Sequence, residues 1–468
     1  MKDSAAGSGA RTALLRSRLI AFIYYIVVSL HPMGRRRTVL VRVIHHRIRA
    51  EDFSWDNPIV PCGEQGRTLM TDLFRRTVVI GGISCFAFPA RAAKKYDPGA
   101  SDTEIRIGNI MPYSGPASAY GIIGKTEAAY FTKSNADGGI NGRKVNFISY
   151  DDAYSPPKAV EQARRLVESD EVLLIFNPLG TSSNSAIQKY MNAKKVPQLF
   201  VASNATKWND PKHFPWTIGF GPSYQLEGRI YAQYLLQNHP EGRIGILYQN
   251  DDFGKDYVKG LKDGLGGKMP IVAEFPYEVQ DTTVDSQVLN LRAAGADVFF
   301  DVATPKFTSQ AIRKVAETGW KPVHVINSTS TSIGAVLKPA GLANSVGLIS
   351  AAWFKDQTDP IWWNDEDYTE WEAFITQYFP DADRTNSYLA SAYIFAQALV
   401  QVLQQCGDDL TRENVMRQAA SLNDLHFGML LPGITANTGP DDFAPIKQMR
   451  MRRFGGEHWE MFGPVFSS

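Results

Sequence analysis

Short runs of apolar residues alternate along most of the chain with segments in which apolar positions recur every three or four residues. The first run after residue 104 is "IRIGNI" (105–110), which is rich in isoleucine. In the stretch 157–169, the apolar positions from Val160 to Val167 follow a helical period instead. Strands that alternate with helices in this way predict a parallel sheet with helices on both faces, an α/β fold.

The alternation predicts two successive series of elements, the second of which begins after Phe220. In the first series we expect strands at 105–110, 145–152, 172–177 and 198–202, and helices at 124–137, 157–169 and 182–193. In the second we expect helices at 224–237, 254–265, 287–294 and 308–318, and strands at 244–249, 271–275, 298–302 and 323–326. Two late helices, 387–405 and 412–420, and a β-hairpin around Gly455-Gly456 complete the prediction. The chain should therefore hold two similar α/β units.

Residues 70–92 have the order of regions found in a secretory signal peptide. Arg75 and Arg76 are followed by an apolar run, 77–90, and by the small residues of Ala90-Arg91-Ala92. We expect cleavage after Ala92 and export to the periplasm, and the arginine pair also resembles a twin-arginine signal. A lipoprotein signal ending at Cys85 is less well matched, because the residues before it lack the usual leucine. The structural alternative is a buried apolar strand or helix.

Residues 1–69 precede this signal and need a separate interpretation. Their apolar run, 19–30, is shorter than the roughly 20 residues that a membrane-spanning helix needs. We interpret Met70 as the true start and residues 1–69 as a disordered, non-native leader that is absent from the mature protein. The alternative is a short membrane-associated extension.

Removal of residues 1–92 changes the charge and the cysteine content. The whole chain carries a formal charge of +1, but 35 basic and 42 acidic residues follow Ala92, a net charge of −7. No basic field for nucleic acid remains. Of the three cysteines only Cys406 lies in the mature part, so no intramolecular disulfide is expected. About 375 residues can bury a core without disulfides, as two domains. We expect a monomer.

Four loops at predicted strand ends are rich in glycine and small hydroxyl residues: 112–121, 177–185, 201–208 and 326–332. Loops of this kind that open helices present free backbone N–H groups at a helix N-terminus, where the partial positive charge suits a carboxylate. The first loop offers Ser114 and Tyr120, and the last offers Ser328 and Thr329. The alternative is helix capping by serine and threonine, which needs no ligand.

The motifs of common enzymes are missing or incomplete. The segment "AYGIIGKT" (119–126) has Ala119 where a P-loop has its first glycine. No dinucleotide-binding glycine motif follows the first strand, and no nucleophile elbow is found. The histidines of the mature part lie far apart, without metal-ligand spacing. The acidic pairs Asp151-Asp152 and Asp251-Asp252 suit acid/base chemistry or a metal, but such acids more often cap helices and bond neighbouring loops. We expect no enzyme, no cofactor and no metal.

Several motifs resemble the substrate-binding proteins of branched-chain amino-acid ABC transporters, the Leu/Ile/Val-binding family. They are "IGNIMPYSGPASAYG", "ADGGINGRKVNFISYDDAYSPPKAVEQARRLV", "GTSSNSAIQKYMNAKKVP" and "ILYQNDDFGKDY". The resemblance spans residues 104–462 and implies a type I periplasmic binding protein fold, with two doubly wound parallel-sheet lobes, three crossover strands and a cleft that closes on a ligand. It implies lobe 1 at 103–222 plus 353–425 and lobe 2 at 223–352 plus 426–468.

The resemblance also implies positions for the ligand. The carboxylate would be held by Gly180 and Thr181 and by the stretch of Ser203, Asn204, Ala205 and Thr206, and an aromatic residue of lobe 2 would be Phe253. Where amino-acid binders hold the ammonium with an acid, this chain has "NSTSTS" (327–332), and Asp301 on the preceding strand end is the candidate substitute. Tyr154 and Leu179 occupy the positions of a disulfide that is common in the family.

We therefore expect a periplasmic protein that delivers a small organic acid to an ABC permease. Aromatic residues in or near the cleft loops suit a flat apolar ligand; they are Tyr120, Trp208, Trp216, Phe220 and Phe253. An aromatic carboxylate is the first expectation and a branched-chain amino acid the second, while ordinary packing of the lobes is the alternative role of the rings. A ligand-sensing domain is the competing function. We expect Asp301 to cap the helix after Thr304 or to bond within lobe 2, which would disfavour ligands with an α-amine.

Overall fold

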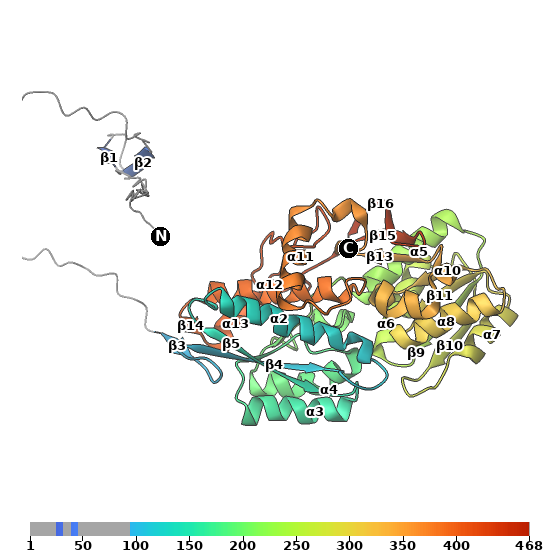
Figure 1. Cartoon of the computed structure of the whole chain (residues 1–468), viewed down its shortest axis with the longest axis horizontal. Helices are drawn as coiled ribbons and strands as arrows, with labels where there is room; N and C mark the ends of the chain where they lie inside the picture. The colour runs from blue at the N-terminus through green and yellow to red at the C-terminus, as the bar shows by residue number, and fades with distance from the viewer. Residues whose placement is uncertain (1–24, 31–38, 45–93, 468) are drawn as a thin grey trace, which may run out of the picture. The chain divides into compact units, whose positions relative to one another are not determined.

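The computed structural model describes residues 25–30, 39–44 and 94–467 (Figure 1). The chain divides into two compact units, 1–90 and 91–468. In the first unit, β1 (Tyr25–Leu30) pairs antiparallel with β2 (Val39–Ile44). The predicted signal peptide lies outside the described residues, as does most of the predicted leader. No helix in the described part of the chain has the length and apolar character to cross a membrane.

The first sheet of the second unit has five parallel strands in the order β5-β4-β6-β7-β8. They are β4 (Glu104–Met111), β5 (Lys144–Asp151), β6 (Leu174–Phe176), β7 (Gln198–Leu199) and β8 (Thr217–Ile218). Helices α3 (Pro156–Arg164) and α4 (Thr181–Lys194) pack together on one face, and α2 (Ile122–Ala136) covers the other (Figure 1). The resulting doubly wound sheet, together with the helices on it, is the first lobe.

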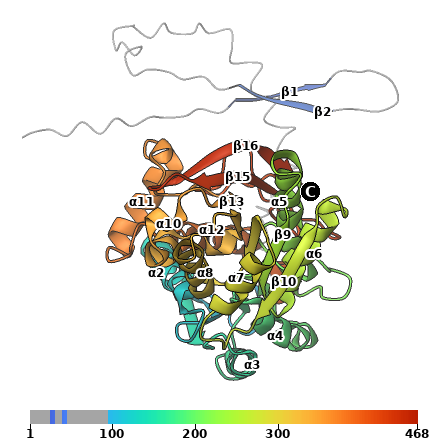
Figure 2. The same ribbon diagram turned by 90° about the vertical axis from the view of Figure 1, so that its right-hand side faces the viewer.

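The second sheet has seven strands in the order β10-β9-β11-β12-β13-β15-β16 (Figure 2). The parallel strands are β9 (Ile244–Gln249), β10 (Ile271–Tyr277), β11 (Val298–Val302), β12 (Val323–Ile326) and β13 (Ile349–Ala352). The hairpin of β15 (Gln448–Phe454) and β16 (Trp459–Ser467) joins them antiparallel through β13. Two pairs of neighbouring helices pack with this sheet: α5 (Tyr224–Asn238) with α6 (Asp252–Leu265), and α7 (Asp285–Ala293) with α8 (Pro305–Glu317). These elements form the second lobe.

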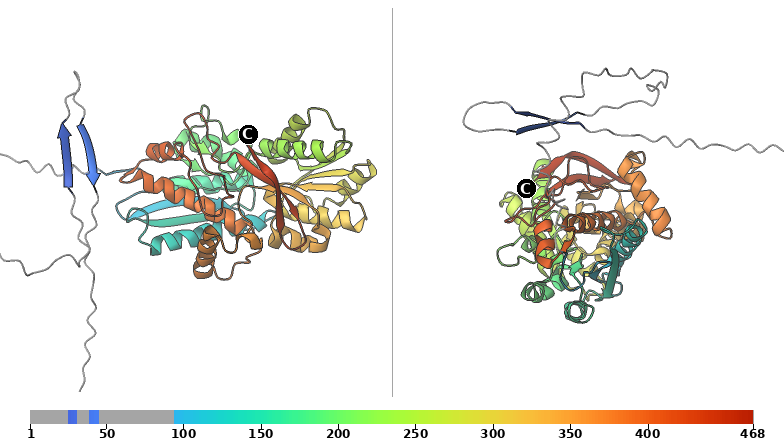
Figure 3. Two further views of the ribbon diagram at one scale, coloured as in Figure 1. Left: turned by 90° about the horizontal axis from the view of Figure 1, so that it is seen from above. Right: turned by 90° about the vertical axis from the view of Figure 1, so that its left-hand side faces the viewer.

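The chain passes between the two sheets three times (Figure 3). It leaves the first sheet after β8 and returns after β13, where α11 (Glu366–Tyr378) and α12 (Tyr388–Cys406) pack against α2. After α13 (Arg412–Ala419) it passes back to β15. The second and third passages run side by side, because the Lys355 N–H donates to the Met429 carbonyl at 2.8 Å and the Leu431 N–H to the Trp353 carbonyl at 3.2 Å. The residue boundaries predicted for the lobes stay predictions.

Several elements differ from the pattern-based prediction. The strands expected at 172–177 and 198–202 shorten to β6, which begins two residues later and ends one residue earlier, and to β7, which ends three residues earlier. The helix expected at 157–169 ends at Arg164 and continues as a π-helical turn, Arg165–Ser169. Strand β13 and helix α11 were not expected from the alternation.

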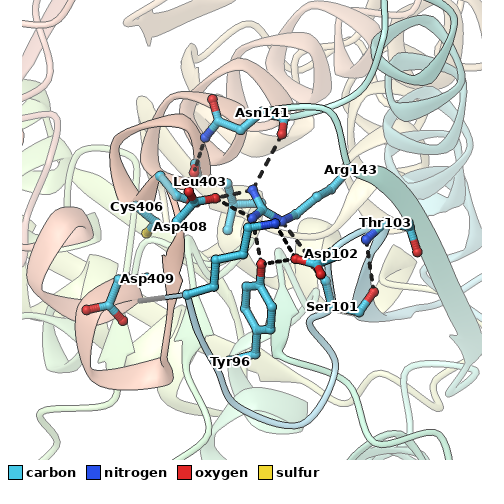
Figure 4. A network of polar contacts seen from close by, with 12 residues as sticks. Tyr96, Ser101, Asp102, Thr103, Asn141, Arg143, Leu403, Cys406, Asp408 and Asp409 are labelled. Carbon is cyan, nitrogen blue, oxygen red and sulfur yellow. Dashed lines mark hydrogen bonds and ion pairs between the residues drawn. The ribbon is translucent and has the colours of Figure 1, made fainter. Parts of the chain in front are cut away.

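The buried Arg143 connects residues near the start of the second unit, 91–468, to the end of α12 (Figure 4). The Arg143 guanidinium is 2% exposed and donates to Asp408 Oδ1 at 2.6 Å and to the Tyr96 hydroxyl at 2.8 Å. Nearby, β14 (Asp409–Leu410) pairs with β3 (Lys95–Tyr96).

Cys406 is the one cysteine in the described part of the chain; it is buried, and burial raises the pKa of its thiol to about 12.

Candidate functional site

A cavity lies at the carboxyl ends of strands from both sheets, as expected for a doubly wound fold. It leaves about 90 Å³ for the centres of water molecules, several times the roughly 10–15 Å³ that one water requires. None of its lining residues is an aspartate, glutamate, lysine, arginine or histidine. The site is therefore lined by hydroxyl groups, rings and backbone, without a formal charge.

The first-lobe wall is built around the start of α4. Gly180 precedes the helix with a φ of +97°, and a Cβ there would lie 2.7 Å from the Tyr154 ring. A side chain at this position would both strain the backbone and collide with the ring. Glycine thus lets the tyrosine cover the turn that opens α4, and the unpaired N–H groups of the first helical turn lie beside the cavity.

The hydroxyls of Thr181 and Ser203 lie 2.7 Å apart on this wall, and both side chains are buried. Trp208 Nε1 donates to Ser203 Oγ at 3.0 Å. Only one of the two hydroxyl protons can lie between Thr181 and Ser203, so the other stays available to an acceptor in the cavity. This is the donor arrangement that a carboxylate needs.

The Tyr224 hydroxyl adds to the same wall. Burial raises the pKa of Tyr224 well above its usual range. Its ring stacks on Tyr257 at a centroid distance of 4.5 Å and meets Phe253 edge-on at 5.2 Å. Tyr224 therefore brings a hydroxyl from α5 to the cavity beside the first-lobe loops that hold Thr181 and Ser203.

The second-lobe wall is formed by the loop after β12. Ser328 Oγ donates to Glu227 Oε2 at 2.6 Å, and Thr329 Oγ1 donates to Asn327 Oδ1 at 2.6 Å. Two phenols meet the same loop, because the hydroxyls of Tyr120 and Tyr388 donate to the Thr329 carbonyl oxygen at 3.2 and 2.8 Å. These bonds connect the first and second lobes across the cavity.

Aromatic rings enclose the rest of the cavity. Trp353, the first residue after β13, lies 6.0 Å from Phe395 of α12 and 4.8 Å from Phe354, between ring centroids. Tyr120 and Tyr388 lie 5.0 Å apart. The enclosed space therefore suits a ligand with an apolar body.

Of the residues predicted for the site, eight line the cavity: Tyr120, Gly180, Thr181, Ser203, Asn204, Phe253, Ser328 and Thr329. The other four lie elsewhere. Ser114 is exposed and its hydroxyl bonds to Asp151. Ala205 is packed in the core, and Thr206 donates through its N–H and its hydroxyl to Asp256, at 2.7 and 2.9 Å.

Asp301 is fully buried in the second lobe and does not line the cavity. Its Oδ2 lies 3.4 Å from His324 Nε2, and its Oδ1 has no partner among the described residues. Burial raises the pKa of its carboxyl group, and the hydrogen bond with His324 lowers it in part. The expected bond within lobe 2 is therefore present, whereas the alternative, capping of the helix after Thr304, is not seen because no side chain caps it.

The sequence reasoning missed most of the aromatic lining. The additional lining residues are Ile123, Tyr154, Leu179, Ala202, Tyr224, Thr304, Trp353, Phe354, Ser387, Tyr388, Ser391 and Phe395. Tyr154 and Leu179 carried a signal, since the family resemblance implies a disulfide at those two positions. The residues of the second passage and of α12 carried none, because only the tertiary fold brings them to the cavity. Trp208 and Phe220 do not line the cavity but pack behind residues that do: Trp208 bonds to Ser203, and the Phe220 ring meets that of Phe395 edge-on at 5.1 Å.

The acidic pairs have structural roles. Asp251 caps α6 by accepting from the N–H groups of Phe253 and Gly254. Asp151 accepts from Tyr113, Ser114 and Ala153, and Asp152 accepts from Tyr154 and Ser183. Within the described residues no cluster of histidine, cysteine and acidic groups could hold a metal ion. Asp251 therefore caps a helix, whereas Asp151 and Asp152 bond to neighbouring loops and to Ser183.

The sequence model of the family described as periplasmic binding protein matches residues 104–457. The Leu/Ile/Val-binding protein homolog 7 of Brucella abortus is 24% identical over 357 residues, covering 73% of this chain and 87% of the relative. The leucine-specific-binding protein of Salmonella typhimurium is 27% identical over 172 residues, 36% of this chain and 45% of the relative.

Solved structures show the same fold. A branched-chain amino-acid ABC transporter protein from Thermus thermophilus, with bound valine, has a TM-score of 0.71 and 14% identity and covers 79% of this chain and 97% of its own. The fatty acid ABC transporter substrate-binding protein from Thermomonospora curvata has a TM-score of 0.68 and 20% identity, with coverage of 80% and 95%. The chain therefore belongs to the periplasmic binding protein family and has the type I fold, and its similar relatives include Leu/Ile/Val-binding proteins.

Proposed function

We propose that this protein captures a small organic acid in the cavity between its lobes and delivers it to an ABC permease. The observation that carries the proposal is the first-lobe wall, where Thr181 and Ser203 share one hydrogen bond and leave one hydroxyl proton for an acceptor. The start of α4 adds the partial positive charge of a helix N-terminus at the same place. A carboxylate supplies the acceptor that both features favour.

The rest of the cavity supports an apolar, aromatic ligand body as the first candidate. Rings of Phe253, Trp353 and Phe395 line it, and no acid lines it to pair with an α-ammonium group. A branched-chain amino acid is the second candidate, favoured by the valine bound to the structurally similar Thermus protein. A ligand-sensing domain remains the competing function. We further propose a monomer without cofactor that works in the periplasm after cleavage near Ala92, which N-terminal sequencing of the mature protein tests.

A ligand screen tests the proposal directly. Thermal shift should identify carboxylates that stabilise the protein, because a ligand at 100 times its Kd adds about 2.7 kcal/mol. Calorimetry on Thr181→Ala should then show binding weaker by about 1–2 kcal/mol, the order of one charge-assisted hydrogen bond. Thr126→Ala is the matched control, since Thr126 is equally buried but bonds only to its own helix, at the Ile122 carbonyl. Equal affinity of Thr181→Ala and the unmodified protein for every ligand found would contradict the assignment.

A further inference from the structure

On the first-lobe wall one hydroxyl proton is available to the cavity, whereas on the second-lobe wall the hydroxyl protons are directed at acceptors of the protein. We propose that Glu227 turns the Ser328 oxygen into a hydrogen-bond acceptor, so that the site selects acids that carry a hydroxyl group at the end remote from the carboxylate. This inference rests on the proposed function, since it adds a second polar contact to an acid already held by the first lobe. Glu227 acts as a positioning residue, because Ser328 and not Glu227 lines the cavity.

The Glu227 side chain on α5 is fully buried and surrounded by donors. Its carboxylate accepts from the Ser328 N–H at 2.7 Å, from Ser328 Oγ at 2.6 Å, and from the hydroxyls of Tyr231 and Tyr257 at 2.6 and 2.8 Å. A carboxylate can only accept, so each of the three hydroxyl protons is directed at it. Four donors bond to the two carboxylate oxygens. These hydrogen bonds explain why the acid can be buried without an ion pair at hydrogen-bond distance.

The bond to Glu227 decides what Ser328 offers to a ligand. The one proton of its hydroxyl group is used, and only oxygen lone pairs are left for the cavity. The Thr329 hydroxyl also offers only lone pairs to the cavity, because its proton is donated to Asn327. The two phenols that reach this loop, Tyr120 and Tyr388, also direct their protons at Thr329 rather than at the cavity. The second-lobe wall around this loop is therefore an acceptor surface.

The opposite wall has the reverse polarity. Thr181 and Ser203 keep one proton for the cavity, and Ser203 Oγ is already an acceptor for Trp208 Nε1. A ligand that satisfies both walls carries an acceptor at one end and a donor at the other. A hydroxyl group fits the second end better than an ammonium group, since no formal charge lines the cavity and a buried unpaired charge is costly.

Two matched pairs of acids test the preference by calorimetry: benzoate against 4-hydroxybenzoate, and 3-phenylpropanoate against 3-(4-hydroxyphenyl)propanoate. In the pair whose length fits the cavity, the hydroxylated acid should bind at least about tenfold more tightly, since the unsubstituted acid leaves buried acceptors unpaired. Equal affinity within both pairs overturns this inference and leaves the proposed function standing. Failure of all four acids to bind contradicts the aromatic acid of the proposed function itself.

Glu227→Gln tests the role of the carboxylate. The amide nitrogen of glutamine can donate to Ser328 Oγ and release the serine proton into the cavity, so the affinity ratio within the pair should fall to near one. Affinity for the unsubstituted acid should stay within about threefold. Glu127→Gln, the same change at a buried glutamate that does not line the cavity, should keep the ratio at about tenfold.

Ser328→Ala provides a second test, which does not depend on the folding of Glu227→Gln. It removes the acceptor oxygen and should also reduce the affinity ratio within the pair to near one. If the affinity ratio between the two acids stays near tenfold in Ser328→Ala, or in a folded Glu227→Gln, the role assigned to Glu227 and Ser328 is overturned.

Discussion

Ser182, in the first turn of α4, donates to Asp251, the residue that caps α6, over 2.7 Å. The bond joins the first lobe to the second beside the cavity. The same carboxylate also accepts from Gln249 Nε2 at 2.7 Å and from two backbone N–H groups of α6. Asp251 is thus held by its own lobe and presents one oxygen to the other lobe.

Ser182→Ala should weaken binding of any ligand that closes the cleft. The variant loses one contact between the lobes and none to the ligand, because Ser182 does not line the cavity. We expect affinity to fall roughly threefold to tenfold, the effect of one hydrogen bond, with the larger change in the dissociation rate. Stopped-flow kinetics measures this. Ser421→Ala, which removes a surface hydroxyl bonded to its own turn, should leave both rates unchanged.

Asp356 lies in the segment where the chain passes between the lobes for the second time. Asp356→Asn should lower the free energy of unfolding. Arg452 and Asp356 form an ion pair at 3.3 Å, with 1% and 2% of their side chains exposed. Loss of one partner leaves a buried charge uncompensated, which typically costs about 3–5 kcal/mol. Chemical denaturation should show this loss. Asp263→Asn breaks an exposed pair with Lys259 and should cost less than about 1 kcal/mol; equal losses in the two variants would count against a stabilising role of the buried pair.

Glu127→Gln should stabilise the protein at alkaline pH and hardly at acidic pH. Glu127 is fully buried, its Oε1 has no partner among the described residues, and its Oε2 lies 3.4 Å from Asn109 Nδ2. Burial raises the pKa of its carboxyl group well above the usual value of 4.5.

A carboxyl group with a higher pKa in the folded chain takes up a proton on folding, so its contribution to stability is lost as pH rises from the unfolded toward the folded pKa. Glutamine does not take up a proton. The gain in unfolding free energy should therefore be at least about 1 kcal/mol at pH 8 and close to zero at pH 4. Denaturation curves at the two pH values measure it, and a gain of the same size at both would show that the cause is not proton uptake.

Phenylalanine should bind at least about ten times more weakly than 3-phenylpropanoate, a difference of about 1.4 kcal/mol. The two ligands differ only in the α-amine, and no acid lines the cavity to receive it. Asp301, the one candidate substitute, is buried against His324. Calorimetry on the two ligands decides the question, and tighter binding of phenylalanine would refute the selectivity argument.

The sequence predicted the parts of the structure that follow from local pattern. Strands β9, β11 and β12 have the predicted bounds, because each is a short buried run between clear helices. The loops with Thr181, Ser203 and Ser328 were found by their hydroxyl content at strand ends, and all three residues line the cavity.

The sequence did not reveal contacts that depend on the arrangement of the lobes. Trp353, Tyr388 and Phe395 reach the cavity only because the chain returns to the first lobe after β13. Glu227 lies in the first turn of α5 and has no pattern that sets it apart from a surface residue. Its role follows from four donors contributed by three segments of the second lobe, an arrangement that no spacing in the sequence encodes.

The burial of Cys406 makes the described part of this chain suitable for a fluorescent biosensor. Its thiol is shielded, and its raised pKa of about 12 leaves almost no reactive thiolate at neutral pH. A cysteine introduced at an exposed position would then react with a maleimide dye almost alone, in a chain that starts near Ala93. Lys207 pairs with Asp252 across the lobes at 3.0 Å and is 39% exposed. A dye at that position lies where the two lobes meet, and its emission should change when a ligand binds in the cavity.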